Sequence, residues 1–438
     1  MTRNRSDNPV KKLLLVAYHF PPQAGSSGLL RSLKFCRYFP ERSWLPVVLT
    51  AHPRAYEHID SSQLEEVPPE VKVIRAFALD TKRHLSIFGH YPLLLALPDP
   101  WVSWVLGGIA AGLVAIQREK IDLIFATFPI ATAVLIGYFL HRLTGIPLVL
   151  DFRDSMTEDE YPPNKTIRRV YGWIERKAIS RGDLFVFTAP STIDMYLSRY
   201  PQLARERCLL IPNGYDEPDF QSLTVGAFDH AHAPLRLLHS GLIYPIERDP
   251  RALFRALARL KRESRVAAAE LRVDLRASGA EEEYSAILRE LDIADIVHLL
   301  PRLPYRQGLQ DAAEASGLLL LQGPSCNHQI PAKLYEYARL RKPILALTPT
   351  QSDTAAMLRR IGGSTLVDLS DDQMIYQALP AFLDQVRKSR HSLPDRVVTM
   401  QFDRRNQAHE LAGRLSELVE KFASDTQIPL HTPKKGIS

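Results

Sequence analysis

The chain has 438 residues, which is enough for two or three domains with sizeable hydrophobic cores. Hydrophobic residues make up 45% and charged residues 24% of the chain, a balance that excludes a disordered, fibrous or small disulfide-stapled protein. Lys plus Arg number 55 and Asp plus Glu number 49, and the resulting net charge of +6 is too small to indicate nucleic-acid binding.

The cysteines and the apolar stretches of the sequence indicate in which cellular compartment the protein is expected. Cys36, Cys208 and Cys326 lie far apart and form no CxxC pair, so neither a zinc site nor a disulfide framework is indicated and a reducing cytoplasm is expected. The basic start of the chain lacks the cleavage pattern of a signal peptide. The longer apolar runs are shorter than a membrane span or contain a proline, so we predict buried elements there.

The first half of the chain alternates short apolar runs with segments of helical periodicity. Brief runs that are apolar throughout are typical of strands buried on both faces of a parallel sheet. Strands are predicted at 11–17, 46–50, 71–74, 122–126, 147–151, 184–188 and 208–211, with helices at 29–39, 101–117, 131–143 and 167–181. This order predicts a doubly wound, Rossmann-like α/β domain over residues 10–218.

The composition changes after residue 216. Residues 216–234 contain Pro, Gly, Asp and His without periodicity, which indicates a linker between domains. Further strands are predicted at 235–240, 271–277, 297–299, 317–322 and 343–347, again alternating with helices. A second Rossmann-like domain is therefore expected over 235–400, followed by a C-terminal helix at 401–424 and a flexible tail at 425–438.

Residues 19–28 form a loop rich in Pro, Gly and Ser between the first strand and the first helix. Such loops bind ligands in parallel sheets, because Gly25 and Gly28 allow close backbone approach and the free N–H groups of the helix favour an anion. The loop lacks the GxGxxG fingerprint, so a glycine needed only for the turn is an equal alternative. Arg31 would point toward an anion or toward the surface.

Charged residues follow the fifth predicted strand directly: Asp151, Arg153 and Asp154. They emerge at the carboxyl edge of the sheet, where charges are costly to bury unless they pair with one another or with a ligand. We therefore expect Arg153 and Asp154 to serve catalysis, with an ion pair between them as the structural alternative. The acidic run 158–160 is expected to be solvated, and no metal site is predicted.

The second domain has a similar junction between its first strand and its first helix. Gly241 follows the strand, and the cation Arg248 lies where a diphosphate would meet the backbone. Near the end of the domain, a predicted helix carries Lys333 and Glu336. A carboxylate accepts hydrogen bonds from both hydroxyls of a ribose, so Glu336 is a candidate for nucleotide binding.

The order of the motifs is more informative than any one of them. The motifs are HFPPQAGSSGLLR (19–31), PDPWVSW (98–104), LDFRD (150–154), IPNGYD (211–216), HSGLIYPIERDP (239–250) and IPAKLYEYARLRKPIL (330–345). In this order, over residues 10–422, they resemble the family 4 type of glycosyltransferases, and most closely its bacterial branch in polysaccharide assembly.

The resemblance implies two Rossmann-like domains facing each other across a cleft, the GT-B fold. It also implies transfer of a sugar from a nucleoside diphosphate sugar to an acceptor hydroxyl, with retention of configuration and without a metal or separate cofactor. The residues expected to bind the donor are Gly25, Gly28, Gly241, Arg248, Lys333 and Glu336. Glu336 matches the second Glu of the family's E-x7-E element, which holds the ribose, and Arg248 matches the cation that meets the diphosphate and supports catalysis.

The sequence departs from the family pattern at three places. His328 stands where the E-x7-E element has its first Glu, which is associated with the donor sugar. Arg153 and Asp154 occupy the region where many relatives have a His near the reacting sugar. Ser155 and Met156 replace the usual Pro-Trp.

Two other interpretations stay open: a nucleotide-sugar epimerase of the same architecture, which would turn over with donor alone, and a non-catalytic scaffold subunit of a glycan assembly complex. The expected partners are the donor and a glycan or lipid-linked acceptor, with no nucleic acid. The protein is expected in the cytoplasm, with peripheral contact at the inner membrane face. Residues 85–104 supply apolar side chains either for this contact or for packing inside the first domain.

Overall fold

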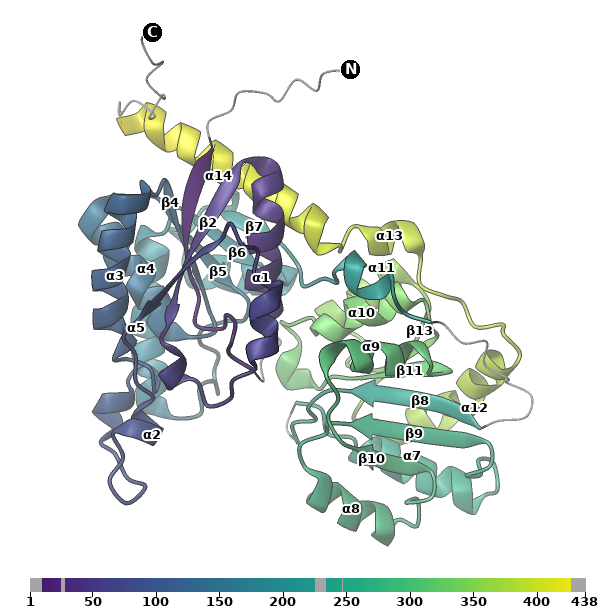
Figure 1. Ribbon diagram of the computed structural model, residues 1–438. Helices are drawn as coiled ribbons and strands as arrows, with labels where there is room; N and C mark the ends of the chain where they lie inside the picture. Colours follow the sequence, from purple (N-terminus) through teal and green to yellow (C-terminus); the bar gives the residue numbers. More distant parts are fainter. Residues whose placement is uncertain (1–9, 25–27, 225–233, 246, 427–438) are drawn as a thin grey trace, which may run out of the picture. The chain divides into compact units, whose positions relative to one another are not determined.

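The structure is a computed structural model that describes residues 10–24, 28–224, 234–245 and 247–426 (Figure 1). The chain divides into two compact units. Unit 1 runs to Ile211 and includes the chain from Arg404 onward, and unit 2 is Pro212–Asp403. Each unit is built on its own parallel sheet with helices on both faces, as predicted for two Rossmann-like domains.

Unit 1 contains, in its described part, a sheet of seven strands in the order β3-β2-β1-β4-β5-β6-β7. The strands are β1 (Lys11–Val16), β2 (Trp44–Ala51), β3 (Lys72–Ala76), β4 (Leu123–Thr127), β5 (Leu148–Phe152), β6 (Leu184–Phe187) and β7 (Cys208–Leu210). The helices are α1 (Gly28–Tyr38), α2 (Thr81–His84), α3 (Trp104–Glu119), α4 (Ala131–Thr144), α5 (Lys165–Arg181), α6 (Pro190–Arg199) and α14 (Arg404–Thr426). All the strands predicted in this half are present.

Helices cover both faces of this sheet, which explains why β4 and β5 are buried along their whole length. Side chains on one face pack against α3, α4 and α5, and those on the other face pack against α1 and α14 (Figure 1). The last helix is attached to unit 1 by polar contacts as well. The indole Nε1 of Trp44 donates to the carbonyl of Ala412 at 3.2 Å and to Ser416 Oγ at 3.0 Å.

The division between the units differs from the predicted linker at 216–234. It falls after Ile211, and residues 212–224 belong to unit 2. The reason is a side-chain contact: Arg339 Nε donates to Glu217 Oε2 at 2.6 Å, which holds the start of the expected linker on unit 2. The C-terminal helix, predicted as a separate segment, packs on unit 1.

Unit 2 contains, among its described residues, six parallel strands in the order β10-β9-β8-β11-β12-β13. The strands are β8 (Leu235–Ser240), β9 (Leu271–Arg276), β10 (Val297–Leu300), β11 (Gly317–Leu321), β12 (Ile344–Leu347) and β13 (Ser364–Val367). The helices are α7 (Arg251–Arg262), α8 (Glu281–Glu290), α9 (Tyr305–Ala313), α10 (Ala332–Leu340), α11 (Asp353–Ile361), α12 (Asp372–Arg387) and α13 (Arg396–Met400). Strand β13 was not predicted, because this half-buried edge strand lacks a continuous apolar run.

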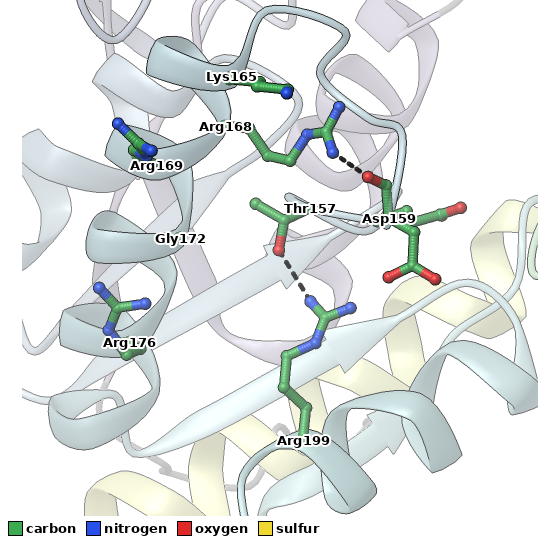
Figure 2. A pocket seen from close by; sticks show the side chains of 9 residues that line it. Thr157, Asp159, Lys165, Arg168, Arg169, Gly172, Arg176 and Arg199 are labelled. Carbon is green, nitrogen blue, oxygen red and sulfur yellow. Dashed lines mark hydrogen bonds between the residues drawn. The ribbon is translucent and has the colours of Figure 1, made fainter.

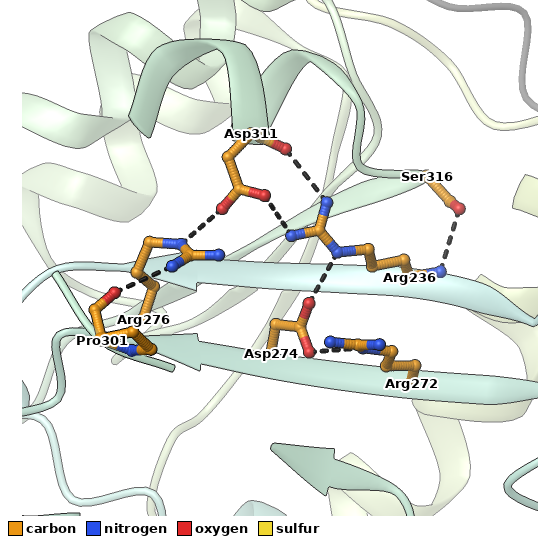
Figure 3. A network of polar contacts seen from close by, with 7 residues as sticks. All are labelled: Arg236, Arg272, Asp274, Arg276, Pro301, Asp311 and Ser316. Atoms are coloured by element: carbon orange, nitrogen blue, oxygen red, sulfur yellow. Dashed lines mark hydrogen bonds and ion pairs between the residues drawn. The ribbon is translucent and has the colours of Figure 1, made fainter. Parts of the chain in front are cut away.

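A network of ion pairs lies between the second sheet and α9 (Figure 3). Asp274 on β9 is 0% exposed and accepts from Arg236 Nε at 2.6 Å and from Arg272 Nε at 2.8 Å. Asp311 on α9 accepts from Arg236 and Arg276. Each arginine of this network therefore has a carboxylate partner inside unit 2, and the two carboxylates offset most of the charge of the three arginines.

Candidate active site

The strand order reverses between β1 and β4 in unit 1 and between β8 and β11 in unit 2. In open parallel sheets, ligands bind outside the carboxyl ends of the strands at such switch points. The segments that leave these strands therefore hold the residues from which a site can be built in each unit.

Asp151 near the end of β5 carries a buried carboxylate that pairs with Arg31 of α1. Arg31 Nε lies 3.1 Å from one carboxylate oxygen and Nη2 lies 2.9 Å from the other, and both side chains are 2% exposed. Thr127 Oγ1 at the end of β4 donates to the same carboxylate at 3.0 Å. Arg31, for which the sequence left an anion or the surface open, thus forms an ion pair that ties α1 to the sheet.

Arg153 leaves the end of β5 and lies against Gly28 at the start of α1. Its Nη1 donates to the carbonyl of Gly28 at 3.0 Å, and a Cβ atom on Gly28 would collide with the guanidinium. Gly28 therefore gives the guanidinium of Arg153 room to approach the start of α1. A role of Gly28 in donor binding stays a prediction, and Gly25 lies outside the described residues.

Arg153 lies near three other ionisable side chains, those of Asp151, Asp154 and His19. Burial lowers the pKa of the Arg153 guanidinium, and the charges of Asp151 and Asp154 oppose that shift. Burial and the charge of Arg153 lower the pKa of His19 to about 3, so this imidazole is neutral at pH 7. The carboxyl edge of unit 1 thus brings together Arg153, Asp154 and a neutral His19. The catalytic roles of Arg153 and Asp154 stay predictions.

Gly241 leaves open backbone at the switch point of unit 2. Its φ of 146° favours glycine, and apart from its chain neighbours no atom of the described residues lies within 4 Å of the place where a Cβ would be. Arg248 lies beside this segment, since its Nη1 donates to the carbonyl of Leu242 at 2.9 Å and its guanidinium lies 5.6 Å from the ring centroid of Tyr244. A guanidinium has five N–H groups, so this contact leaves donors for an anion.

Glu336 in α10 carries a carboxylate that is 6% exposed and held from two sides. Lys333 Nζ lies 2.9 Å from Oε2, and the Tyr305 hydroxyl donates to Oε1 at 3.1 Å. Burial is the largest influence on the pKa of Lys333 and lowers it, but the charge and hydrogen bond of Glu336 together with the charge of Tyr337 outweigh burial, so this pKa is raised. Lys333 therefore stays protonated, and the carboxylate keeps lone pairs for further hydrogen bonds.

His239 at the end of β8 links these groups. Its Nδ1 lies 3.0 Å from the carbonyl of Leu319, and burial lowers its pKa to about 4, with Arg248 and Lys333 acting in the same direction. The backbone N–H of Ser240 donates to the Tyr337 hydroxyl at 3.1 Å, which ties α10 to the end of β8. The structure thus brings the predicted donor-binding residues of the second domain to the carboxyl edge of its sheet.

Sequence reasoning missed His19, His239 and Tyr305 as members of these edges. The two histidines begin the motifs at 19–31 and 239–250, but residue spacing in a sequence does not distinguish a buried imidazole from an exposed one. Tyr305 begins a different helix, 31 residues before Glu336, so only the tertiary structure reveals the contact. His328, which replaces the first Glu of the family element, is half-buried between β11 and α10.

The described residues contain neither a metal-binding cluster nor a membrane-spanning helix. No group of three or more His, Cys, Asp or Glu side chains in the described part is placed to hold a metal ion. None of the helices described has the length and apolar character needed to cross a membrane.

Comparison with known proteins gives one family match. Residues 61–217, most of which lie in unit 1, match the family model described as Glycosyltransferase Family 4. No curated protein matches the chain in sequence.

Solved structures match nearly the whole chain at low identity. Sucrose-phosphate synthase from Thermosynechococcus elongatus has a TM-score of 0.64 and 14% identity, covering 94% of this chain and 100% of that one. Anabaena Alr3699/HepE, solved with UDP and glucose, has a TM-score of 0.58 and 15% identity, covering 95% and 99%. A UDP-N-acetylglucosamine 2-epimerase has a TM-score of 0.53 and 12% identity, covering 98% and 100%. Residues 61–217 are thus similar to glycosyltransferase family 4, and the solved structures share the fold of two Rossmann-like domains over nearly the whole chain.

Proposed function

We propose that the protein is a retaining, metal-independent glycosyltransferase that uses a nucleoside diphosphate sugar in polysaccharide or cell-envelope glycan synthesis. The carboxyl edge of unit 2 carries this proposal, because open backbone at Gly241 lies beside the cation Arg248, and Lys333 and Glu336 lie near the same strand end. The match of residues 61–217 to glycosyltransferase family 4 supports the same chemistry. The UDP found with the Anabaena neighbour supports a nucleotide-sugar donor.

In this proposal, the donor is held by charge and by hydrogen bonds. The diphosphate lies on the open backbone at Gly241, where Arg248 and Lys333 balance its negative charge. Glu336 accepts hydrogen bonds from the hydroxyls of the ribose. Because Glu336 raises the pKa of Lys333, the cation stays protonated in the range where the enzyme works.

The transfer exchanges one bond at the anomeric carbon for another. The bond from this carbon to the diphosphate oxygen breaks, and its electron pair leaves with the diphosphate. The acceptor hydroxyl oxygen bonds to the same carbon, and the hydroxyl proton is released. Negative charge grows on the leaving diphosphate, so cations fixed beside it stabilise the transition state more than the ground state.

The acceptor in this proposal is linked to a lipid, and unit 1 has exposed apolar side chains suited to peripheral membrane contact. Ile87, Phe88 and Leu94 are 72%, 97% and 77% exposed. Trp101 and Trp104 pack instead against the ring of Tyr18, with centroids 4.3 and 6.1 Å apart. Membrane contact is therefore expected from residues 87–94 and not from the two tryptophans.

A thermal-shift panel of UDP, GDP, ADP and CMP tests the donor site. A nucleotide at about 100 times its dissociation constant adds about 2.7 kcal/mol to the stability of the folded protein. We expect one nucleoside diphosphate to raise the melting temperature of the parent and of the control Arg390→Ala, which removes an exposed cation after α12. Arg248→Ala and Glu336→Ala should lose the shift. A shift that survives in both variants would remove this site from the proposal.

Acceptor dependence separates the transferase from an epimerase. With the nucleotide sugar that corresponds to the bound diphosphate, a transferase releases nucleoside diphosphate mainly when an acceptor is present. Conversion of the donor into an isomeric nucleotide sugar without acceptor would contradict the transferase proposal.

Vesicle co-sedimentation tests the membrane contact. Phe88→Ser combined with Leu94→Ser should reduce binding to phosphatidylglycerol vesicles, whereas Leu143→Ser, which changes a 62% exposed leucine on α4, should not. Equal sedimentation of both variants would argue against contact through this loop.

A further inference from the structure

A basic pocket of about 540 Å³ lies in unit 1, along the loop that follows β5 (Figure 2). Its lining includes the cations Lys165, Arg168, Arg169 and Arg176 from α5 and Arg199 from α6, against two carboxylates. The volume lies within the usual range of ligand pockets. The excess of positive charge indicates an anionic ligand.

The protein itself uses part of this charge. Arg199 Nη1 donates to Thr157 Oγ1 at 2.9 Å and to the fully buried Glu175 at 2.8 Å. Arg168 Nε donates to the carbonyl of Pro162 at 2.8 Å, and its Nη1 donates to the carbonyl of Asp159. Figure 2 shows the contacts from Arg168 to Asp159 and from Arg199 to Thr157, which hold these two guanidinium groups in place at the pocket.

The other cations, Lys165, Arg169 and Arg176, are exposed, and their side chains make no hydrogen bond or ion pair with any residue that the structure describes. Their spacing of four and seven residues brings them toward one face of α5. Lys165 and Arg169 also lie in the first turns of the helix, where the helix dipole favours acidic residues, and the first turn of α5 has none. An anion in the pocket would relieve this repulsion.

The backbone of the helix end is already satisfied. Asn164 Oδ1 accepts from the N–H groups of Thr166 and Ile167 at 2.9 and 3.2 Å. The side-chain cations, and not the helix N-terminus, are therefore the groups available to a ligand.

We propose that this pocket binds a phosphate or diphosphate group carried by the acceptor. The inference rests on the proposed function: the donor diphosphate is assigned to unit 2, so an anion held by unit 1 belongs to the second substrate. Thr157 follows Phe152, the last residue of β5, by five residues, which places the start of the pocket within about 18 Å of the end of β5. Guanidinium groups form paired hydrogen bonds with phosphate oxygens, which suits Arg169 and Arg176 to this ligand.

Calorimetric titration with inorganic diphosphate tests the pocket without requiring activity. The variant Arg169→Gln/Arg176→Gln should bind diphosphate in unit 1 about tenfold more weakly than the parent. The matched control Lys177→Gln/Arg181→Gln removes two exposed cations of the same helix that do not line the pocket, and it should bind as the parent does. The variant Arg248→Gln should lose only binding that belongs to unit 2.

The outcomes separate this inference from the proposed function. Parent-like diphosphate binding by Arg169→Gln/Arg176→Gln, or loss of all diphosphate binding in Arg248→Gln, overturns the pocket and leaves the donor site standing. Loss of the nucleotide shift is a separate result, because it reports on unit 2. Circular dichroism of each variant confirms that the fold is retained, as expected for exposed side chains.

A second titration distinguishes the carrier of the phosphate. Glucose 6-phosphate and farnesyl diphosphate represent a soluble and a prenyl-linked acceptor, and vesicles with phosphatidylglycerol represent the membrane surface. Binding of either soluble compound that weakens in Arg169→Gln/Arg176→Gln supports an acceptor phosphate. Binding of vesicles alone that depends on these two arginines overturns the acceptor assignment, since the pocket would then be a membrane-surface contact.

A substitution of Asp159, a carboxylate in the lining of the pocket, should strengthen diphosphate binding instead of weakening it. Asp159→Asn removes a negative charge from the lining, while the backbone carbonyl that holds Arg168 is kept. Diphosphate should bind about twofold to threefold more tightly to this variant. Unchanged or weaker binding would contradict an anion in the pocket.

Discussion

Two regions of the molecule contain clusters of cations, and the clusters differ in whether carboxylates pair with them. Between the second sheet and α9, Arg236, Arg272 and Arg276 each have a carboxylate partner on Asp274 or Asp311 (Figure 3). Along α5 of unit 1, Lys165, Arg169 and Arg176 line a pocket without such a partner among the described residues (Figure 2). Paired charges of opposite sign leave little net field and depend on each other's presence, whereas aligned charges of one sign repel one another until a ligand of opposite sign binds.

Unit 1 also contains a paired cation, and removing its partner should have the largest effect. Asp151→Asn removes the carboxylate that pairs with the buried guanidinium of Arg31, which should lower the unfolding free energy of unit 1 by about 3 to 5 kcal/mol. The four tryptophans of the chain all lie in unit 1, so their fluorescence in urea reports on this unit. Arg169→Gln on the same unit should change stability by less than about 0.5 kcal/mol. Equal effects of the two substitutions would erase the contrast.

The network of unit 2 should respond somewhat less strongly. Asp274→Asn removes the shared partner of Arg236 and Arg272, but Arg236 keeps Asp311, so a loss of about 2 to 3 kcal/mol is expected. Urea unfolding followed by far-ultraviolet circular dichroism measures it. Arg272→Gln is the control, since this side chain is 44% exposed and its ion pair contributes about 1 kcal/mol or less. A loss under about 1 kcal/mol in Asp274→Asn would show that the network is not structural.

Acid should destabilise both units through one imidazole each. The pKa of His19 is lowered to about 3 and that of His239 to about 4, whereas a histidine in the unfolded chain titrates near 6.5. The unfolded state therefore binds more protons below pH 6.5, and stability that is complete above this pH falls toward the folded pKa values. Between pH 6.5 and 5, each histidine should remove about 1 to 2 kcal/mol.

The matched variants for this effect are His19→Gln and His239→Gln. Each should flatten the dependence of stability on pH over the same interval, the first in the tryptophan fluorescence of unit 1 and the second in circular dichroism. A slope as steep as that of the parent in both variants would assign the acid effect to other groups.

The smallest change in unfolding free energy is expected from substitutions in the basic pocket, and the sign of this change shows whether the cations repel one another. Arg169→Gln/Arg176→Gln removes repulsion between cations on one helix face, so stability should stay unchanged or rise by about 0.2 to 0.5 kcal/mol. Added phosphate should raise the melting temperature of the parent more than sodium chloride at equal ionic strength does, and this difference should disappear in the variant. A loss of more than about 1 kcal/mol in the variant would indicate that the cations are structural.

Much of the architecture follows from local patterns. Short apolar runs between helical segments predicted the strands of both sheets to within a few residues, because burial on both faces demands such runs. The rule that ligands bind beyond the strand ends predicted Gly241, Arg248 and Glu336 at one edge of unit 2, and the family resemblance added Lys333. The structure has these residues near that edge, and their roles in donor binding stay predictions. The edge strand β13 was missed because its half-buried residues lack that signal.

The pairing of side chains was decided by the tertiary structure alone. Arg31 and Asp151 are 120 residues apart, and Gly28 and Arg153 are 125 residues apart. Each pair meets because the parallel topology brings the start of α1 beside the end of β5, and no local pattern encodes which strands become neighbours. The return of α14 to unit 1 has the same origin.

The sequence by itself thus determined the alternation of strands and helices, the chemistry available at each strand end and the likeness to family 4 glycosyltransferases. Only the tertiary structure decided which charges are neutralised and which face a pocket, as the contrast between Asp274 and Arg176 shows. The physical reason is range. Burial periodicity is set over a few residues, whereas the partner of a charge is set by contacts between residues far apart in the chain.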